Sequence, residues 1–378
     1  MSLSVKQGDW IEDNSQDEVI PFKYAITSYG ADFPVDGLVK RISAGDIEIP
    51  SFQRSYVWNP KQASRFIESL LLGLPVPGVF LSKEQGTQKL LVIDGQQRLR
   101  TLQYFYAGRY QQSDKVFALK GVQSKFNGLT YAQLKDEDRR RLHDSIIHAT
   151  IVKQDEPSDD DSSIYYIFER LNTGGTLLQP QEIRACIYHG EFNELLRRLN
   201  KDKAWRSIYG TTSSRMRDQE LILRFFAMLS NSGNYKKPMK EFLNAYMGRN
   251  RHLEHERESG LTKAFERTVQ LLYRVVGKSS FKPKNALNAA VFDSVMVGLA
   301  KRLAKGSLKD EKVVKRSYLE LLDNVNFMSA CETGTADEEN VSRRLSLATR
   351  AFSSIRGESK RLSSTSKDLM PYLRKFPL

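Results

Sequence analysis

Apolar residues change their spacing near residue 155, and this change restricts the possible folds more than any other feature of the chain. Before it, short strand-like segments such as Val79–Leu81 and Leu90–Ile93 alternate with segments of helical three- and four-residue spacing. After it, almost every segment has helical spacing. The acidic, proline-containing stretch 154–163 separates the two patterns and is typical of a surface loop or a domain boundary. We therefore expect an α+β fold, with a mixed domain over residues 1–155 followed by a mostly α-helical domain over residues 160–378.

The first part contains local signals for strands and helices. Ile47–Ile49 and Ser145–Val152 are predicted strands, and the Gly-containing stretch Lys83–Thr87 is a predicted hairpin loop. Asn59 followed by Pro60 predicts the start of a helix. In the second part the predicted helices are Ile164–Leu171, Pro180–Tyr188, Asp218–Leu229, Lys263–Val276, Ala286–Leu303, Glu311–Leu322 and Glu338–Ile355.

Composition excludes several classes of protein. The 378 residues include two cysteines, Cys186 and Cys331, which rules out a disulfide framework or a cysteine zinc site and fits a reducing cytoplasm. No run of about eighteen apolar residues occurs, so we expect no membrane span. The first residues are acidic and polar, unlike a secretory signal.

Positive charge is concentrated in the second half of the chain. Residues 1–200 carry 24 Lys and Arg against 26 Asp and Glu, whereas residues 201–378 carry 34 against 19. We expect the basic half to contact the phosphates of DNA, although solubility or an acidic partner would also explain the charge. Tyr235 and Tyr318 lie nearby and would either stack on bases or pack in the core. The predicted DNA contacts are Lys236, Lys237, Arg249, Arg251, Lys315, Arg316, Arg343 and Arg344.

Three segments carry chemical groups in close spacing. The first, Ile49–Trp58, combines Gln53 and Arg54 with the aromatic residues Phe52, Tyr56 and Trp58 just before a predicted helix. The sequence leaves open whether the aromatics only pack on the domain while Arg54 pairs with a surface carboxylate.

The second segment, Val92–Leu102, predicts a strand that ends at Asp94, a turn at Gly95 and a helix that begins at once. The unpaired N–H groups of a helix N-terminus favour anions. Arg98 in the first helical turn is placed to hold a phosphate, and Asp94 to hold Mg²⁺ or a ribose hydroxyl. Junctions of this kind are also common as purely structural turns.

The third segment, Phe168–Arg184, predicts a helix that breaks at Asn172, Gly174 and Gly175 and restarts at Pro180. The glycines permit positive φ angles or close backbone approach. A helix C-cap followed by a capped new helix is the alternative structural interpretation.

Together the three segments resemble the N-terminal domain of the GmrSD family of type IV restriction endonucleases. The family pattern is an IPxFQRxYxW segment, a DGQQR box and an FxRLNxxGxxL segment, and all three occur here in that order over about the first half of the chain. Arg217–Phe226 resembles the helical continuation of the family. Gly95–Arg98 also resembles the arginine box of the ParB and sulfiredoxin folds, which holds nucleotide phosphates.

The resemblance implies a ParB/sulfiredoxin-like domain that binds an NTP with Mg²⁺ and hydrolyses it during restriction of modified foreign DNA. Carried over by position, Asp94–Arg98 would form the phosphate box, with Gln96 or Gln97 orienting the attacking water. Gln53 and Arg54 would contact nucleotide or DNA, and Asn172 and Gly174 would close the site.

Many members of the family cut DNA with an HNH-type nuclease, which needs histidine and further ligands around a metal. His252 and His255 lie three residues apart, but no third ligand motif accompanies them, so surface histidines are the favoured interpretation. We therefore expect a separate HNH-type nuclease as partner. A homo-oligomer is compatible with the sequence. The alternatives are a nucleotide-gated DNA-binding switch without turnover and an interaction scaffold with an inactive box.

Overall fold

The computed structural model describes residues 25–49, 56–84, 87–111, 113–156, 162–171, 179–308 and 310–356. The chain forms two compact units. The sheet unit contains Phe22–Leu178 and Ala185–Ile187, and the helical unit contains Gln179–Arg184 and Tyr188–Leu378. The helix α5 (Ser162–Leu171) belongs to the sheet unit, because it packs on strands of the sheet and buries Tyr165 and Phe168. Apart from Ala185–Ile187, the structure therefore divides the chain after Leu178, whereas the sequence predicts the division at residues 155–160.

Five strands form one mixed sheet in the order β1-β5-β3-β4-β2. β1 pairs antiparallel with β5, β5 pairs parallel with β3, β3 pairs antiparallel with β4, and β4 pairs parallel with β2. The antiparallel β3–β4 pair confirms the hairpin predicted around Lys83–Thr87. The strands are β1 (Ala25–Pro34), β2 (Ile47–Glu48), β3 (Val79–Lys83), β4 (Leu90–Asp94) and β5 (Ile146–Glu156).

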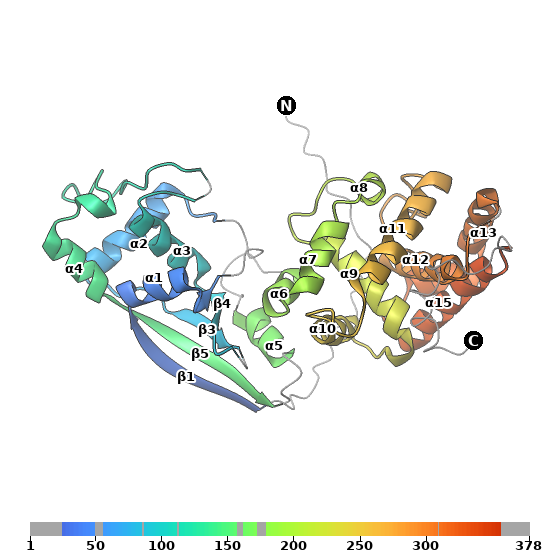
Figure 1. Cartoon of the computed structure of the whole chain (residues 1–378), viewed down its shortest axis with the longest axis horizontal. Helices are drawn as coiled ribbons and strands as arrows, with labels where there is room; N and C mark the ends of the chain where they lie inside the picture. Colours follow the sequence, from blue (N-terminus) through green and yellow to red (C-terminus); the bar gives the residue numbers. More distant parts are fainter. Residues whose placement is uncertain are drawn as a thin grey trace. The chain divides into compact units, whose positions relative to one another are not determined.

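Four helices gather over the sheet (Figure 1). They are α1 (Val35–Ala44), α2 (Pro60–Leu71), α3 (Gln96–Ala107) and α4 (Asp136–Asp144), with the short 3-10 helix η1 (Tyr131–Gln133) between α3 and α4. Asn59 caps α2 by accepting a hydrogen bond from the Gln62 backbone at 3.0 Å, which confirms the predicted helix start. The apolar faces of these helices and of the strands, including Leu38, Ile67 and Leu102, form one core.

The sequence did not reveal β1. Its residues, Ala-Ile-Thr-Ser-Tyr-Gly-Ala-Asp-Phe-Pro, include glycine, aspartate and proline, which are rare in strands, and they lack regular alternation. Its pairing with β5 over the register from Ala25–Glu156 to Pro34–Ile146 holds the strand extended. A partner more than a hundred residues away in the chain, rather than local propensity, therefore determines this strand.

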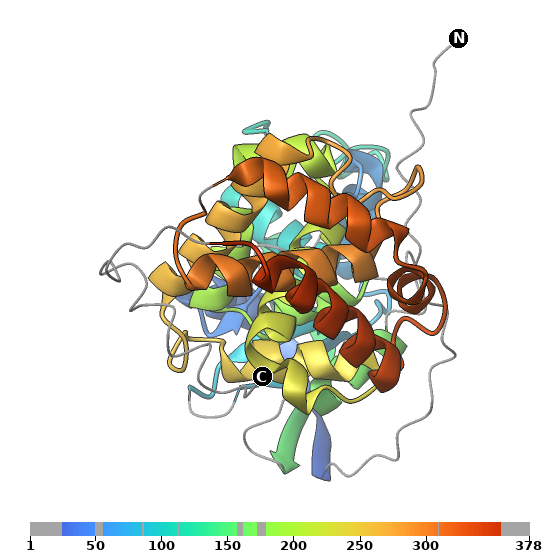
Figure 2. The ribbon, with the colours of Figure 1, turned by 90° about the vertical axis from the view of Figure 1, so that its right-hand side faces the viewer.

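The helical unit is built around α12 (Ala289–Ala304), whose side chains are buried on almost every side. α9, α11 and α15 pack on it, and the orange and red helices of the unit face the viewer in Figure 2. Gly298 permits the contact with α15, since a Cβ atom there would lie 2.8 Å from the Ala348 carbonyl group. The other helices are α6 (Pro180–Ile187), α7 (Glu191–Leu199), α8 (Lys203–Tyr209), α9 (Arg217–Asn231), α10 (Met239–Arg249), α11 (Glu258–Val275), α13 (Glu311–Asp323), α14 (Val325–Glu332) and α15 (Glu338–Ser353), with the 3-10 helix η3 (Ser232–Asn234).

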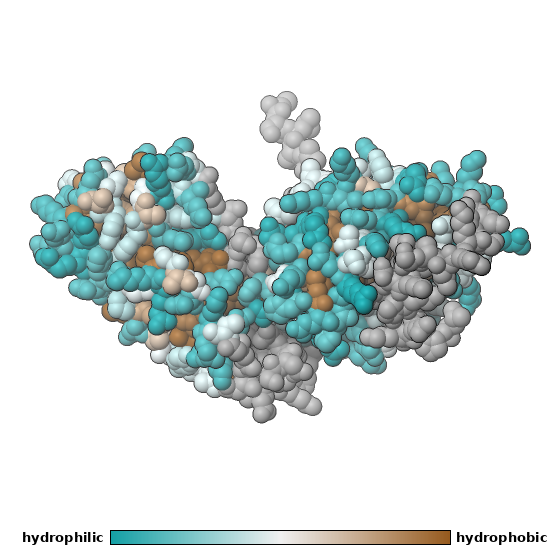
Figure 3. Space-filling view, viewed as in Figure 1, coloured by the Kyte–Doolittle hydropathy of each residue, from teal (hydrophilic) through white to brown (hydrophobic). Residues whose placement is uncertain are grey.

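The arrangement confirms the predicted α+β class, a mixed sheet followed by a mostly helical part. Hydrophilic residues dominate the face of each unit seen in Figure 3. Within the described ranges, no helix is both long enough and apolar enough to cross a membrane.

Candidate functional site

The junction between β4 and α3 has an unusual helix start. Gly95 occupies the N-cap position with φ +97°, and no side chain caps the helix there. A Cβ atom on Gly95 would lie 2.4 Å from Cγ1 of Val79, so both the backbone angle and the space require glycine. The first N–H groups of α3 thus start from a residue that offers them no side-chain acceptor.

Asp94 and Arg98 form an ion pair across this junction. The Nη2 atom of Arg98 lies 2.8 Å from Oδ2 of Asp94, and 16% of the Arg98 side chain is exposed against 47% for Asp94. The buried Nε of Arg98 has no hydrogen-bond partner. The guanidinium group therefore keeps donor capacity beyond its bond to Asp94, while the carboxylate keeps one half of its surface in solvent.

Gln97 has a different role from its neighbour in the box. Its Oε1 accepts hydrogen bonds from the backbone N–H groups of Val57 at 2.9 Å and Trp58 at 3.3 Å. The side chain therefore holds the end of the segment Ile49–Trp58 against the first turn of α3. Gln96 is half-buried at the first position of the helix.

The described aromatic residues of the first segment pack on the domain. The Tyr56 hydroxyl lies 2.8 Å from Oγ1 of Thr101, and its ring meets Tyr104 edge-on with centroids 5.1 Å apart. Trp58 packs edge-on against Phe66. Burial raises the pKa of Tyr56 to about 12. These contacts support the structural interpretation of Tyr56 and Trp58, and no sequence pattern indicated Thr101 as a partner.

Several predicted site residues lie outside the described residues. They are Phe52, Gln53 and Arg54 of the first segment and Asn172, Gly174 and Gly175 of the third. Their proposed contacts with nucleotide or DNA stay predictions.

A divalent cation at this junction would depend on few protein ligands. Among the residues that the structure describes, no group of three or more His, Cys, Asp or Glu side chains is arranged to hold a metal. Mg²⁺ commonly binds through one or two carboxylates together with substrate phosphates and water. The half-exposed carboxylate of Asp94 fits that mode, provided that a phosphate supplies further ligands.

The predicted DNA contacts differ in their surroundings. Lys236, Arg249, Lys315 and Arg316 are exposed and make no ion pair with other described residues. Lys237 lies 3.9 Å from Asp337, Arg343 pairs with Glu339, and Nε of Arg251 donates to the His189 carbonyl oxygen at 2.7 Å.

Arg344 is not available as a DNA contact, because its side chain is fully buried between α12 and α15. Its guanidinium group lies 3.7 Å from the carboxylate of Asp293, which also binds Arg224 through two hydrogen bonds. Burying a charge requires a compensating partner, and one carboxylate here serves two arginines. The helical periodicity of α15 places Arg344 on the face of Val341 and Ala348, and this signal would have distinguished it from Arg343.

Tyr235 and Tyr318, the two tyrosines near the predicted DNA contacts, belong to the core. The Tyr235 hydroxyl donates to the Ala336 carbonyl oxygen, and the Tyr318 hydroxyl donates to the Ser280 carbonyl oxygen, both at 2.6 Å. Both side chains are buried. Neither is exposed for stacking on a base.

The two histidines of the possible metal pair lie on the surface. Nδ1 of His252 lies 2.8 Å from a carboxylate oxygen of Glu191, and His255 is exposed. This placement agrees with the interpretation as surface histidines.

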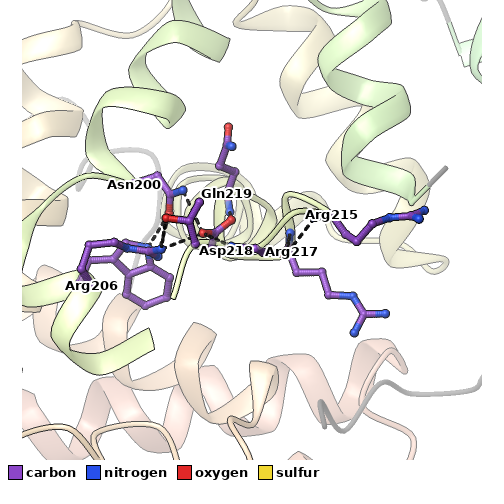
Figure 4. Close-up of polar contacts among 9 residues, drawn as sticks. Asn200, Arg206, Arg215, Arg217, Asp218 and Gln219 are labelled. Carbon is purple, nitrogen blue, oxygen red and sulfur yellow. Dashed lines mark hydrogen bonds and ion pairs between the residues drawn. The ribbon is translucent and has the colours of Figure 1, made fainter. Parts of the chain in front are cut away.

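In the segment Arg217–Phe226, the buried carboxylate of Asp218 accepts hydrogen bonds from the residues that precede α9 (Figure 4). Oδ2 of Asp218 accepts hydrogen bonds from Arg206 at 2.9 Å, Asn200 at 3.0 Å and the Ser213 backbone at 3.1 Å. The Asn200 side chain in turn accepts from the Trp205 indole at 2.9 Å. Because Asp218 is fully buried and multiply bonded, its role in this unit is structural.

The sheet unit is thus an α+β domain in which strand β4 leads through Asp94 and Gly95 into α3, a helix without a side-chain cap. Residues 35–189 match the family model of the GmrSD restriction endonuclease, N-terminal domain. The match confirms the resemblance that the motifs of this part of the chain predicted, and it implies involvement in a type IV restriction system. No curated protein matches the chain.

Proposed function

We propose that the chain binds an NTP together with Mg²⁺ at the β4–α3 junction and hydrolyses it as part of a type IV, modification-dependent DNA restriction system. The observation that carries this proposal is the start of α3 at Gly95, which has no side-chain cap, with Arg98 in the first turn. The N–H groups of a helix start and a guanidinium group are both donors that bind phosphate. A ParB/sulfiredoxin-like nucleotide-binding role of the sheet unit is part of the same proposal.

Each box residue has a role in this proposal. For the binding of a phosphate, Arg98 contributes the exposed donors of its guanidinium group that it does not use toward Asp94. Asp94 is the only residue of the box with a carboxylate, and its exposed half would hold Mg²⁺ between itself and the phosphates. Gly95 has no side chain, so the backbone at this position could approach the phosphates closely. Gln96 is the candidate to orient the attacking water, because the acceptor of Gln97 is occupied by two backbone N–H groups.

Hydrolysis at such a site needs neutralisation of charge on the transferred phosphoryl group more than covalent chemistry. The N–H groups of α3 and the Arg98 guanidinium supply fixed positive charge at that place. Gln53, Arg54, Asn172 and Gly174 are proposed to complete the nucleotide or DNA contacts, on the basis of the family resemblance alone.

DNA is the proposed partner of the helical unit. Lys236, Arg249, Lys315 and Arg316 are its exposed candidates, and contacts of this type bind phosphates without reading sequence. A separate HNH-type nuclease is the proposed source of the cut, on the basis of the family resemblance, and His252 of the one closely spaced histidine pair is engaged by Glu191.

A phosphate-release assay with each of the four NTPs, with and without duplex DNA, tests the proposal. Arg98→Ala should abolish nucleotide binding in a folded protein. Arg141→Ala is the matched control, since Arg141 also pairs with an acidic residue four positions earlier, Glu137, in the same unit. This variant should behave like wild type. Asp94→Asn should mainly weaken the dependence on Mg²⁺. Unchanged nucleotide affinity in Arg98→Ala would refute the assignment.

A nucleotide-gated DNA-binding switch without turnover is the second candidate. The ion pair between Asp94 and Arg98 favours it, because a carboxylate that already binds a guanidinium group is a weaker ligand for Mg²⁺. Binding of an NTP that alters DNA affinity, without release of phosphate from any of the four NTPs, would select this function over hydrolysis.

A further inference from the structure

We infer that Gln97 is a positioning residue, which fixes the first turn of α3 for the phosphates by clamping it to the backbone of Val57 and Trp58. The inference rests on the proposed NTP site and assigns different roles to the two glutamines of the box. Gln97 directly precedes Arg98, so whatever holds its side chain also restricts the turn that carries the guanidinium group.

The hydrogen bonds of Gln97 exclude a role in activating water. An amide oxygen has two lone pairs, and here backbone N–H groups at 2.9 Å and 3.3 Å occupy both. Both partners are donors, which requires the oxygen rather than the nitrogen of the Gln97 amide to face them. The remaining NH₂ group only donates, so it cannot accept a proton from an attacking water.

A second anchor fastens the same segment to α3. The Tyr56 hydroxyl lies 2.8 Å from Oγ1 of Thr101, and the Thr101 hydroxyl donates to the backbone oxygen of Gln97 at 2.7 Å. Tyr56 therefore contacts the helix one turn beyond the residue whose side chain holds Val57 and Trp58. Together the two anchors tie three consecutive residues to the first two turns of α3.

The clamped segment, Tyr56–Trp58, is also fixed at its C-terminal end, where it contacts α2. Trp58 packs edge-on against Phe66 of α2, with ring centroids 5.7 Å apart, and Asn59 caps α2. The clamp therefore connects the N-terminal ends of α2 and α3. Rotation of the α3 start would have to break contacts on both helices.

The clamp should contribute little to overall stability. Val57 is 60% exposed, so water can replace Gln97 as the acceptor for the Val57 N–H group. A variant without the amide oxygen should therefore fold, and its effect should appear at the nucleotide site. This separation makes the inference testable with full-length protein.

The test compares Gln97→Met, which keeps the length of the side chain but removes the acceptor, with Gln103→Met on the same helix as a control. Tyr56→Phe removes the second anchor without adding charge. Each variant is titrated with ATP, GTP, CTP and UTP, and turnover is measured by phosphate release. We expect Gln97→Met to raise Kd and KM about tenfold, with a smaller change in kcat. Tyr56→Phe should shift Kd in the same direction, and Gln103→Met should match wild type.

Hydrogen–deuterium exchange of peptides containing Val57 and Trp58 gives a readout that is independent of nucleotide. Protection should fall in Gln97→Met and stay unchanged in Gln103→Met. A loss of kcat with unchanged Kd would make Gln97 catalytic and overturn the inference. Lost protection with wild-type Kd and KM would make it merely structural and would also overturn it. If wild type binds none of the four NTPs, the proposed function itself fails.

Discussion

Substitution of Gly95 tests how closely the residues of the β4–α3 junction pack, because it changes the free energy of unfolding. In Gly95→Ala the new Cβ atom would lie 2.4 Å from Cγ1 and 2.9 Å from Cβ of Val79, at a backbone φ of +97°. The left-handed backbone angle costs about 1–2 kcal/mol for a residue other than glycine. Overpacking against a buried side chain adds about 1–3 kcal/mol. We therefore expect Gly95→Ala to lower the free energy of unfolding by about 2–5 kcal/mol.

Gly108→Ala is the matched control at the other end of the same helix. Gly108 has φ +72°, and a Cβ atom there would meet nothing within 4 Å, so only the backbone cost of about 1–2 kcal/mol should appear. Urea unfolding followed by circular dichroism measures both variants. Combining Gly95→Ala with Val79→Ala removes the contact at 2.4 Å and should recover part of the loss. Equal destabilisation by Gly95→Ala and Gly108→Ala would refute the steric reasoning.

Three further predictions concern buried groups. Asp293→Asn leaves its two arginine partners without a counter-charge and should destabilise the protein by about 3–5 kcal/mol in urea unfolding, whereas Glu339→Gln on the surface should cost less than about 1 kcal/mol. Burial raises the pKa of Cys331 to about 12, so the folded protein should resist alkylation of this thiol at pH 8, and mass spectrometry should find it labelled only after unfolding. The pKa of Tyr56 is raised from 10.0 to about 12, so stability that is present below pH 10 should be lost as the pH rises toward 12. Melting temperatures at pH 9 and pH 11 should differ less in Tyr56→Phe than in wild type.

Local patterns predicted the junction well, because its determinants are close together in the chain. The apolar run Leu90–Ile93, the glycine and the apolar spacing of α3 are readable without tertiary information. Local patterns could not, by contrast, predict the different roles of Gln96 and Gln97. The two residues have the same side chain, and the backbone N–H groups that bind Gln97 lie some forty residues earlier in the chain. Only the folded arrangement of α2 and α3 brings the Gln97 amide to these N–H groups.

β1 was unpredictable for a related reason. Its extended shape depends on β5, and its own residues have weak strand propensity. By contrast, the predicted helices of the helical unit were found because their apolar faces repeat with the helical period over many residues. The shorter helices α7, α8, α10 and α14 were not predicted, since seven to eleven residues offer few turns over which to see a period.

The positive charge of the second half is used in two physically different ways. Arg344 and Arg302 are buried, the first beside Asp293 and the second on the Ile355 carbonyl oxygen, so both stabilise the helical unit from inside. Charge counted along the sequence therefore overstates the charge that faces a polyanion. Each neutralised phosphate contributes a fixed amount to the slope of log binding constant against log salt concentration. We therefore expect this slope for DNA to reflect exposed residues such as Lys315 and Arg316, and not the total excess of Lys and Arg over Asp and Glu in that half. The same distinction separates the adjacent residues Arg343, which pairs with Glu339 on the surface, and Arg344, which is buried beside Asp293.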